Sequence, residues 1–348
     1  MKNLCAQICG GLLFAVANYA AMAQAQPAAQ APAGNAVPVT PDNFNRAETD
    51  MNFAGGGGKE VGRFLHHREP ISIDFPIVRP NRDTLYSLSV FDLDAGPVTV
   101  TLPNAGQRFM SMQVIDQDQY TPMVVYRAGR HTLTKEQIGT RYVVTAIRTL
   151  VDPTSPDDVK QVHALQDAIQ VEQKSPGRFE VPNWDQASQK KVHDALLALA
   201  ETLPDTKRTF GPRDQVDPVR HLIGTAFAFG GNPEKDALYL NVTPSQNDGA
   251  TVHRLIVGEV PVDAFWSISV YNAEGHFQKN TFGAYALNNI TAKKEADGTV
   301  PVQFGDCDGK ILNCLPIMPG WNYMVRLYRP RAEILNGTWK FPKAQPEN

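Results

Sequence analysis

The sequence predicts a mostly β protein in which a helical connector joins two antiparallel β domains. Strand-like runs of alternating polarity occupy residues 71–147 and return after Tyr239. They follow one another too closely for crossover helices, which favours an antiparallel sandwich or barrel over a doubly wound sheet. A chain of 348 residues also exceeds the size that one hydrophobic core usually serves. We therefore expect two domains.

The first 23 residues have the features of a secretory signal peptide. Lys2 gives a positive start, an apolar stretch follows, and Ala21-Met22-Ala23 forms a cleavage site. The apolar stretch is shorter than the about 20 residues that a membrane span needs. Cleavage after Ala23 removes Cys5 and Cys9. We expect a periplasmic or secreted protein without a membrane span.

The rest of the N-terminal half divides into a leader and a β domain. Residues 24–39 consist mainly of Ala, Gln, Pro and Gly, which predicts a disordered leader. Thr40-Pro41-Asp42 predicts the start of a short helix that ends before the glycine run at 55–58. The N-terminal β domain is then expected over residues 40–150.

Helical signals fill the predicted connector, residues 151–231. Ser155-Pro156 predicts one helix start and Asp217-Pro218 another, and between them a further helix is expected over about 186–203. The C-terminal β domain is expected over residues 232–348, where strand patterns are clearest at 265–271 and 323–328.

Charge and cysteine content restrict the partners and the compartment. Removal of the signal peptide, whose single charged residue is Lys2, changes the formal net charge from -3 to -4, and the basic residues are scattered. Nucleic acid is therefore not an expected partner. Cys307 and Cys314 remain after cleavage, and in an oxidising compartment we expect a local disulfide rather than two free thiols.

Sequence motifs in both halves indicate a family. The first half contains RPNRDTLYSLSVFDLDAGPVTVTLP, followed by a strand that ends in Asp116. The second half contains FWSISVYNAEGHFQKN, DGTVPVQF, NCLP, RLYRP and GTWKFP in that order. On these motifs the chain resembles the bacterial proteins that pair domain of unknown function 1254 with domain of unknown function 1214. The resemblance covers nearly the whole mature chain.

The resemblance implies two jelly-roll-like sandwiches and self-association, with a trimer as one form of it. It implies no particular reaction. The chain departs from the family pattern at Asn313-Cys314-Leu315-Pro316, where Asn-Trp-Leu-Pro is usual. An expected disulfide partner thus replaces a tryptophan.

Common catalytic and metal-binding motifs are missing from the sequence. It contains neither GxSxG nor HExxH. His66 and His67 are adjacent, so on a strand they would point to opposite faces and could not chelate one metal together. Near Asp306 the glycine and Lys310 do not fit a calcium loop. We expect no metal and no cofactor.

The strand pattern at residues 109–118 places two acids at the end of an apolar face. Alternation continues from Met110 through Val114 to Asp116 and Asp118. Either the strand leaves the core there and the acids are solvated, or they line a cavity mouth where a raised pKa supports acid/base catalysis. We favour solvation, because buried acids are rare without partners.

Two further groups of residues are candidates for a ligand site. Asn81, Asp83 and Tyr86 lie at a strand entrance, where they either cap a turn or form a polar rim together with Tyr120. In the second domain the candidates are Asn280, Arg326 and Tyr328. An arginine among apolar neighbours needs a carboxylate, supplied either by the protein or by a ligand.

Two functions remain open at this stage. The first is an exported hydrolase that acts on a small or envelope-derived substrate, with Asp83 and Asp116 as acid/base groups and the other candidates as binding residues. The second is a non-catalytic binding or assembly protein that forms a homo-oligomer. We expect any site where the Asn81 to Tyr86 entrance approaches the end of the Met110 to Asp118 strand. The fold alone cannot decide between the two functions.

Overall fold

The computed structural model describes residues 36–55, 60–75 and 78–347. The predicted signal peptide, most of the predicted leader and most of the glycine run lie outside these residues. The chain divides into two compact units. Unit 1 comprises residues up to Glu69, Thr84–Val151 and Ser155–Pro233, and unit 2 comprises Pro70–Asp83, Asp152–Thr154 and the rest from Glu234.

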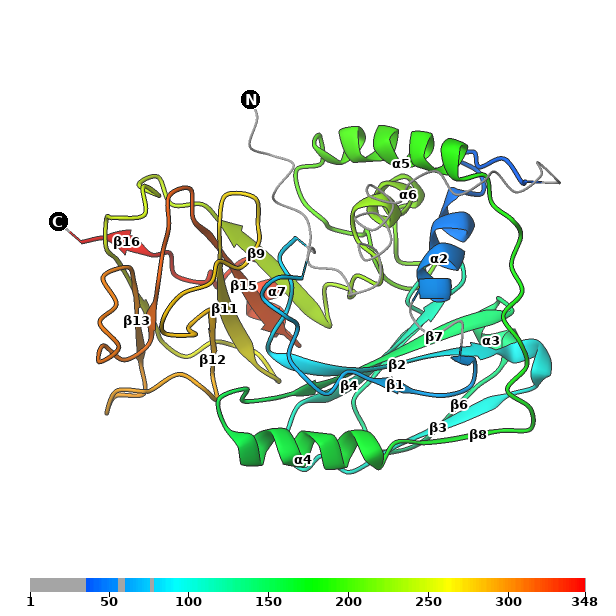
Figure 1. Ribbon diagram of the computed structural model, residues 1–348, viewed down its shortest axis with the longest axis horizontal. Coiled ribbons are helices and arrows are strands. Elements are labelled where there is room, and N and C mark those ends of the chain that lie inside the picture. The colour runs from blue at the N-terminus through cyan, green and yellow to red at the C-terminus, as the bar shows by residue number, and fades with distance from the viewer. Residues whose placement is uncertain (1–35, 56–59, 76–77, 348) are drawn as a thin grey trace. The chain divides into compact units, whose positions relative to one another are not determined.

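Unit 1 contains two antiparallel sheets (Figure 1). The larger sheet has the strand order β1 (Leu65–His66), β2 (Thr84–Asp92), β7 (Tyr142–Leu150), β4 (Met110–Asp116) and β5 (Met123–Val125). The smaller sheet has the order β6 (Gly129–Leu133), β3 (Val98–Leu102) and β8 (Gln170–Gln173). Short helical turns occur at η3 (Leu93–Ala95) and α3 (Lys135–Ile138).

One hydrophobic core joins these two sheets. It includes Val100 and Leu133 from the smaller sheet and Met112, Val114 and Ile147 from the larger one. Alternation along β4 directs Met112 and Val114 to the same face as Asp116, as the sequence predicts. This register decides where Asp116 lies.

The helices of residues 155–233 belong to unit 1. In Figure 1, α5 (Gln186–Ala200) and α6 (Pro218–Phe227) lie beside α2 (Phe44–Gly55), and apolar residues of all three form one cluster. The fourth helix, α4 (Pro156–Asp167), packs Val162 against Leu85 of β2. These amphipathic helices bury their apolar faces on their own unit, so this segment is a part of unit 1 and not a separate body.

Several predicted boundaries match the structure. Ser155 and Asp217 are the N-caps of α4 and α6, as predicted. The first helix begins later than the predicted Thr40 cap, because the Asn43 side chain accepts the Thr40 N–H at 2.8 Å and holds a turn before Phe44.

Unit 2 contains two four-stranded sheets. One has the order β12 (Ala286–Asn288), β11 (Trp266–Tyr271), β15 (Asn322–Tyr328) and β9 (Ala237–Val242), all antiparallel. The other has the order β14 (Cys314–Leu315), β13 (Val300–Phe304), β10 (His253–Val257) and β16 (Gln345–Pro346), in which only β13 and β14 are parallel. A short helix, α7 (Ala332–Leu335), follows β15.

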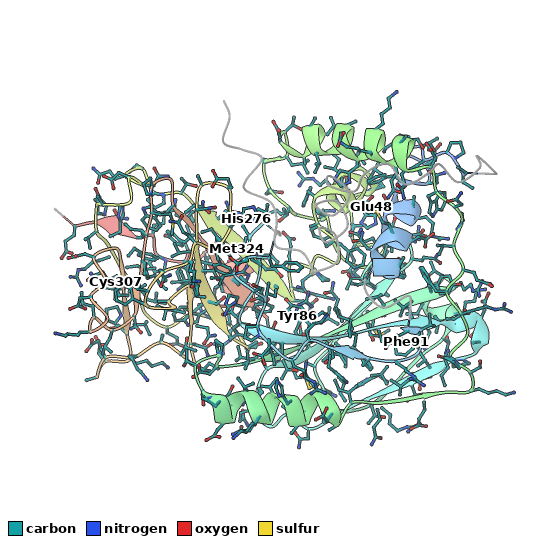
Figure 2. All side chains as sticks on the ribbon, viewed as in Figure 1. Glu48, Tyr86, Phe91, His276, Cys307 and Met324 are labelled. Carbon is teal, nitrogen blue, oxygen red and sulfur yellow. A yellow bond between two sulfur atoms is a disulfide. The ribbon has the colours of Figure 1, made fainter. Side chains whose placement is uncertain are left out.

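The apolar faces of both unit 2 sheets share one core. Ile268 and Val325 contribute from one sheet, and Val302 and Phe304 from the other. The predicted disulfide between Cys307 and Cys314 is present and closes the connection from β13 to β14 (Figure 2). The described chain is therefore mostly β with several antiparallel sheets, as predicted. Among the described helices, none has the length and apolar character that crossing a membrane requires.

Candidate functional site

The turn after β4 fixes the carboxyl group of Asp116 in unit 1. Its Oδ1 accepts the backbone N–H groups of Asp118 and Tyr120, each at 2.9 Å. The backbone N–H of Asp116 also donates to the Tyr120 carbonyl at 2.9 Å, while Gln119 takes a left-handed conformation with φ of 67°. The turn therefore orients the carboxyl group without using a cation.

Asp116 is only 4% exposed, because it ends the apolar face that Met112 and Val114 begin. This burial contradicts the solvated interpretation that the sequence favours. Burial raises the pKa of Asp116 from 3.8 to about 7, with a smaller raising effect of the nearby Asp118 carboxylate and against the lowering effects of the Tyr120 N–H and the Arg213 charge. Asp116 is therefore a carboxyl group that can gain or lose a proton near neutral pH.

Asp118 has a different environment. Arg46 of α2 approaches one of its oxygens at 2.7 Å, and Arg213 approaches the other at 3.0 Å. Its side chain is 23% exposed. Asp118 is therefore an ion-paired group that anchors the turn to two other segments of unit 1.

Tyr120 completes this end of the turn. Its ring stacks on the ring of His221 at 4.0 Å, and the Arg213 guanidinium lies 4.1 Å from the Tyr120 centroid. His221 faces the carbonyl oxygens of Asp118 at 2.9 Å and Thr209 at 3.2 Å, and burial lowers its pKa. A neutral imidazole can donate to only one of these oxygens. These contacts hold the turn against α6.

Unfilled hydrogen-bonding capacity remains in the same turn. Gln119 is 1% exposed, and among the residues that the structure describes neither its amide nitrogen nor its amide oxygen has a hydrogen-bond partner. Buried polar groups rarely stay unpaired, so such a group is a candidate ligand contact.

Another buried acid is Asp50 of α2. Its carboxyl group accepts from Gln117 at 2.5 Å and Trp184 at 2.9 Å, and burial raises its pKa.

Tyr86 does not join this group. β2 and β4 both pair antiparallel with β7, and in that register Tyr86 and Ser111 both face Arg148, whereas Asp116 faces Val143. Tyr86 therefore lies at the opposite end of the sheet from Asp116, with the Arg148 guanidinium 5.5 Å from its ring centroid. Figure 2 shows Tyr86 and Phe91 toward opposite ends of β2. The predicted approach of the Tyr86 entrance to Asp116 is therefore wrong.

Unit 2 contains a second set of buried polar groups on one sheet. The register of β12, β11 and β15 places Asn288, Ser267 and Arg326 in one row across the sheet. Arg326 is 1% exposed. It donates to the Ser269 hydroxyl, the Tyr271 hydroxyl and two backbone carbonyls at 2.8 to 3.1 Å. The predicted arginine among apolar neighbours is thus satisfied within unit 2.

Asp83 lies close to this row. Its Oδ1 accepts from the Asn288 amide at 3.2 Å, and its Oδ2 has no hydrogen-bond partner within residues 36–55, 60–75 and 78–347. Burial raises the pKa of Asp83, while the positive charge of Arg326 opposes this rise. Burial alone would lower the pKa of Arg326, but the Tyr271 hydroxyl and the Asp83 carboxyl raise it instead. Within the part of the chain that the structure describes, Asp83 and Arg326 thus influence each other's pKa inside unit 2 without forming a direct ion pair.

The remaining candidates hold local structure. Asn81 accepts the Asp83 N–H at 2.9 Å and donates to the Tyr328 hydroxyl at 3.3 Å. Tyr328 stacks on Phe265 at 4.2 Å. Asn280 caps its own turn, since its oxygen accepts the Phe282 and Ala284 N–H groups. Asn280 is therefore a turn residue, which is the ordinary role of asparagine.

Part of the Asp116 environment could not be predicted from the sequence. Asp50, Gln119, His221 and Arg213 have no motif that singles them out, and α2 and α6 are far from β4 in the sequence. The one indication in the sequence was that Gln119 lies between two predicted binding residues, Asp118 and Tyr120.

No group of three or more His, Cys, Asp or Glu side chains suited to a metal occurs within residues 36–55, 60–75 and 78–347.

Comparison with protein families finds two matches. Residues 61–138 match the model described as protein of unknown function (DUF1254), and residues 239–332 match the one described as protein of unknown function (DUF1214). The chain therefore carries these two family regions in the order that its motifs predict. No functionally curated protein matches the sequence.

Two solved structures are similar in fold. One is the VPA0106 protein from Vibrio parahaemolyticus, with a TM-score of 0.67 and 15% identity over 88% of this chain and 98% of that one. The other is an uncharacterized protein from Burkholderia cenocepacia, with a TM-score of 0.50 and 14% identity over 88% and 87% of the two chains. At such low identity the likeness shows the fold alone.

Proposed function

We propose that this chain is an exported envelope protein in which Asp116 performs acid/base hydrolysis of a small or envelope-derived substrate. The observation that carries the proposal is the buried Asp116 carboxyl group, whose pKa of about 7 suits proton transfer at neutral pH. The unpaired Gln119 amide in the same turn supports it, because this amide offers a donor and an acceptor to a substrate.

The proposed reaction uses the proton that Asp116 exchanges. As a carboxylate, Asp116 takes a proton from water while the water oxygen bonds to the carbonyl carbon of an ester or amide. The bond to the leaving group then breaks, and the leaving group takes the proton from Asp116. The Gln119 N–H donates to the substrate oxygen that gains negative charge. Water is consumed, and Asp116 returns to its starting state.

Export rests on separate observations. The N-terminal sequence has the order of a signal peptide. The Cys307–Cys314 disulfide is of a kind that persists in oxidising compartments. Intact mass measurement of periplasmic material tests export: the expected protein begins near Gln24 and has no thiol that reacts before reduction. A retained N-terminus or two reactive thiols would count against it.

A hydrolysis screen tests the catalytic proposal. Purified mature protein is offered esters, amides and glycosides, and the rate is followed from pH 5 to pH 9. We expect turnover of one class, with a rate that depends on a group titrating near 7. Asp116→Asn should abolish turnover, while Asp157→Asn, which changes an 87% exposed carboxylate of the same unit, should not. Equal activity of wild type and Asp116→Asn would refute the proposal.

Assembly is a second candidate function, supported by an exposed apolar patch on unit 2. Phe282, Ile311 and Leu312 are all exposed, and the Phe282 ring lies against Gly309 of the disulfide loop. Such a patch is typical of an interface. On this view the units are jelly-roll-like sandwiches that form a homo-oligomer, with a trimer as one form of it. Light scattering with Leu312→Glu tests it: the variant should be monomeric, and a monomeric wild type would refute it.

A further inference from the structure

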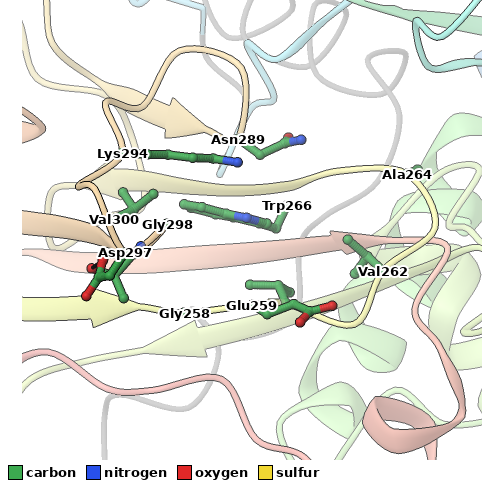
Figure 3. Close-up of a pocket in the computed structure, with 12 residues that line it drawn as sticks. Gly258, Glu259, Val262, Ala264, Trp266, Asn289, Lys294, Asp297, Gly298 and Val300 are labelled. Atoms are coloured by element: carbon green, nitrogen blue, oxygen red, sulfur yellow. Dashed lines mark hydrogen bonds between the residues drawn. The ribbon is translucent and has the colours of Figure 1, made fainter.

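Unit 2 contains a cavity of about 360 Å³ (Figure 3). One wall is the connection from β10 to β11, residues 258–264, and the other includes residues 294–300, which lead into β13. Trp266 and Asn289 complete the lining. None of the residues proposed for hydrolysis lines this cavity. Its size lies in the range of small-molecule sites, which is roughly 300 to 1,000 Å³.

The wall that leads into β13 is held in a defined shape by its own hydrogen bonds. Asp297 accepts the Thr299 N–H at 2.9 Å and the Thr299 hydroxyl at 2.7 Å. Glu295 donates its N–H to the Thr299 carbonyl at 2.8 Å, and Gly298 donates to the Glu295 carbonyl at 2.9 Å. Lys294 immediately precedes this closed turn. Its backbone position is therefore fixed before any ligand arrives.

Three groups around the cavity have unused binding capacity. Asn289 Oδ1 is buried and has no hydrogen-bond partner in the described parts of the chain. An unpaired buried oxygen destabilises the fold unless a donor reaches it. Lys294 and Glu259 form no ion pair or hydrogen bond within the part of the chain that the structure describes. The cavity thus offers the Asn289 oxygen, the Lys294 cation and the Glu259 carboxylate to a ligand. A second carboxylate, Asp297, also lines the cavity but already accepts from Thr299, and the charge of Glu259 also acts on Arg331.

The opposite charges occupy different sides of an apolar centre. In the view of Figure 3, the Lys294 side chain extends above the Trp266 ring toward Asn289, and the Glu259 carboxylate lies below the ring. Val262 adds apolar surface close to Glu259 in the same view. A ligand that fills this space must carry a negative end, a positive end and a donor between them. Neutral sugars lack the charged ends.

We propose that this cavity binds a short peptide in its zwitterionic form. The peptide carboxylate pairs with Lys294, and the terminal ammonium pairs with Glu259. The internal peptide N–H donates to Asn289 Oδ1, which satisfies the buried oxygen. The apolar surface of Trp266 contacts the side chains between the charged ends. This binding site is independent of Asp116 and of hydrolysis.

Calorimetry on the full mature protein tests the proposal with alanyl-alanine as the probe. Its N-acetylated and C-amidated forms each lack one charged end. We expect each blocked form to bind about tenfold more weakly, as expected for loss of one hydrogen bond to a charged group. Lys294→Gln should weaken the binding of alanyl-alanine to the same extent. In this variant, C-amidation of the probe should not weaken binding any further. Glu259→Gln should likewise remove the effect of acetylation.

Matched variants separate binding from folding. Lys310→Gln and Glu274→Gln change exposed residues of the same unit and should leave binding unchanged. Asn289→Leu should weaken binding without lowering the melting temperature, because it removes an unpaired buried oxygen. Absence of alanyl-alanine binding, equal binding of the blocked forms, or unchanged binding by Lys294→Gln and Glu259→Gln would overturn the proposal. Tighter binding of a neutral disaccharide such as maltose would overturn it as well.

Discussion

Asp116 in unit 1 and Asp83 in unit 2 are both almost completely buried, at 4% and 2% exposure, yet their surroundings differ. Two backbone N–H groups hold Asp116, and the charges that act on it are the Asp118 carboxylate and, more weakly, the Arg213 guanidinium. Asp83 instead lies within the field of the buried Arg326. Burial raises both pKa values, but only the second carboxyl is coupled to a cation that holds a sheet together. The comparison separates a proton-exchanging acid from a structural one.

The largest expected effect on stability comes from replacing Arg326, the buried cation that acts on Asp83. Arg326→Met removes donors to four oxygen atoms and leaves the weaker charge of Arg82 as the cation that acts on the buried Asp83. We expect the free energy of unfolding to fall by about 3 to 5 kcal/mol. Urea denaturation measures this. Arg254→Met, which breaks an exposed pair with Glu347, should change it by only about 0.5 kcal/mol, and equal losses for both variants would contradict the account.

Asp116→Asn tests the raised pKa of Asp116 through its effect on the free energy of unfolding. Because the pKa of Asp116 is raised from 3.8 to about 7, the folded protein keeps a proton that the unfolded chain loses in this range. Wild-type stability relative to the variant should therefore fall as pH rises, by about 3 kcal/mol between pH 5 and pH 8. Denaturation at both pH values measures it. A difference that does not change with pH would contradict the raised pKa, and Asp157→Asn serves as the control.

Removal of the disulfide should have a slightly smaller effect. The bond joins residues seven positions apart, and on the chain-entropy model such a short loop contributes about 2 to 3 kcal/mol. Cys307→Ser combined with Cys314→Ser should lower the free energy of unfolding by this amount. Hydrolysis should be unaffected, because the bond lies in unit 2. Loss of turnover in this variant would contradict the assignment of hydrolysis to unit 1 alone.

The smallest expected effect concerns the helix that supports the Asp116 turn. The Asp217 side chain accepts the Val219 and Arg220 N–H groups at the start of α6, which carries His221. Asp217→Ala should lower stability by about 1 kcal/mol. If α6 holds Tyr120 in place, the turnover rate should fall as well. An unchanged rate with the expected loss of stability would limit α6 to a purely structural role.

Local pattern predicted much of the fold, because alternation and capping are visible in a few neighbouring residues. It placed Asp116 at the end of the apolar face of β4 and identified Ser155 and Asp217 as helix starts. The disulfide also followed from its short spacing. The family regions were predicted from motifs in both halves.

The rest depended on contacts between distant segments. The burial of Asp116 follows from the two sheets that enclose the core of unit 1, and single-strand alternation does not show what covers a strand end. Tyr86 was misplaced because its distance from Asp116 depends on the register of β2 and β4 against β7. Asn280 is a polar residue of a type that binds ligands, but its side chain caps its own turn. Side-chain identity alone cannot separate these roles.

The most direct test of the central claim is the titration of the Asp116 carboxyl group itself. Carbon-13 spectra of protein labelled at aspartate carboxyls are recorded from pH 3 to pH 9, and the Asp116 signal is assigned by its absence in Asp116→Asn. We expect a midpoint near 7, because burial at the end of β4 raises the pKa of this carboxyl group. A midpoint close to the ordinary value of 3.8 would show an ionised acid at neutral pH and contradict the proposed acid/base role.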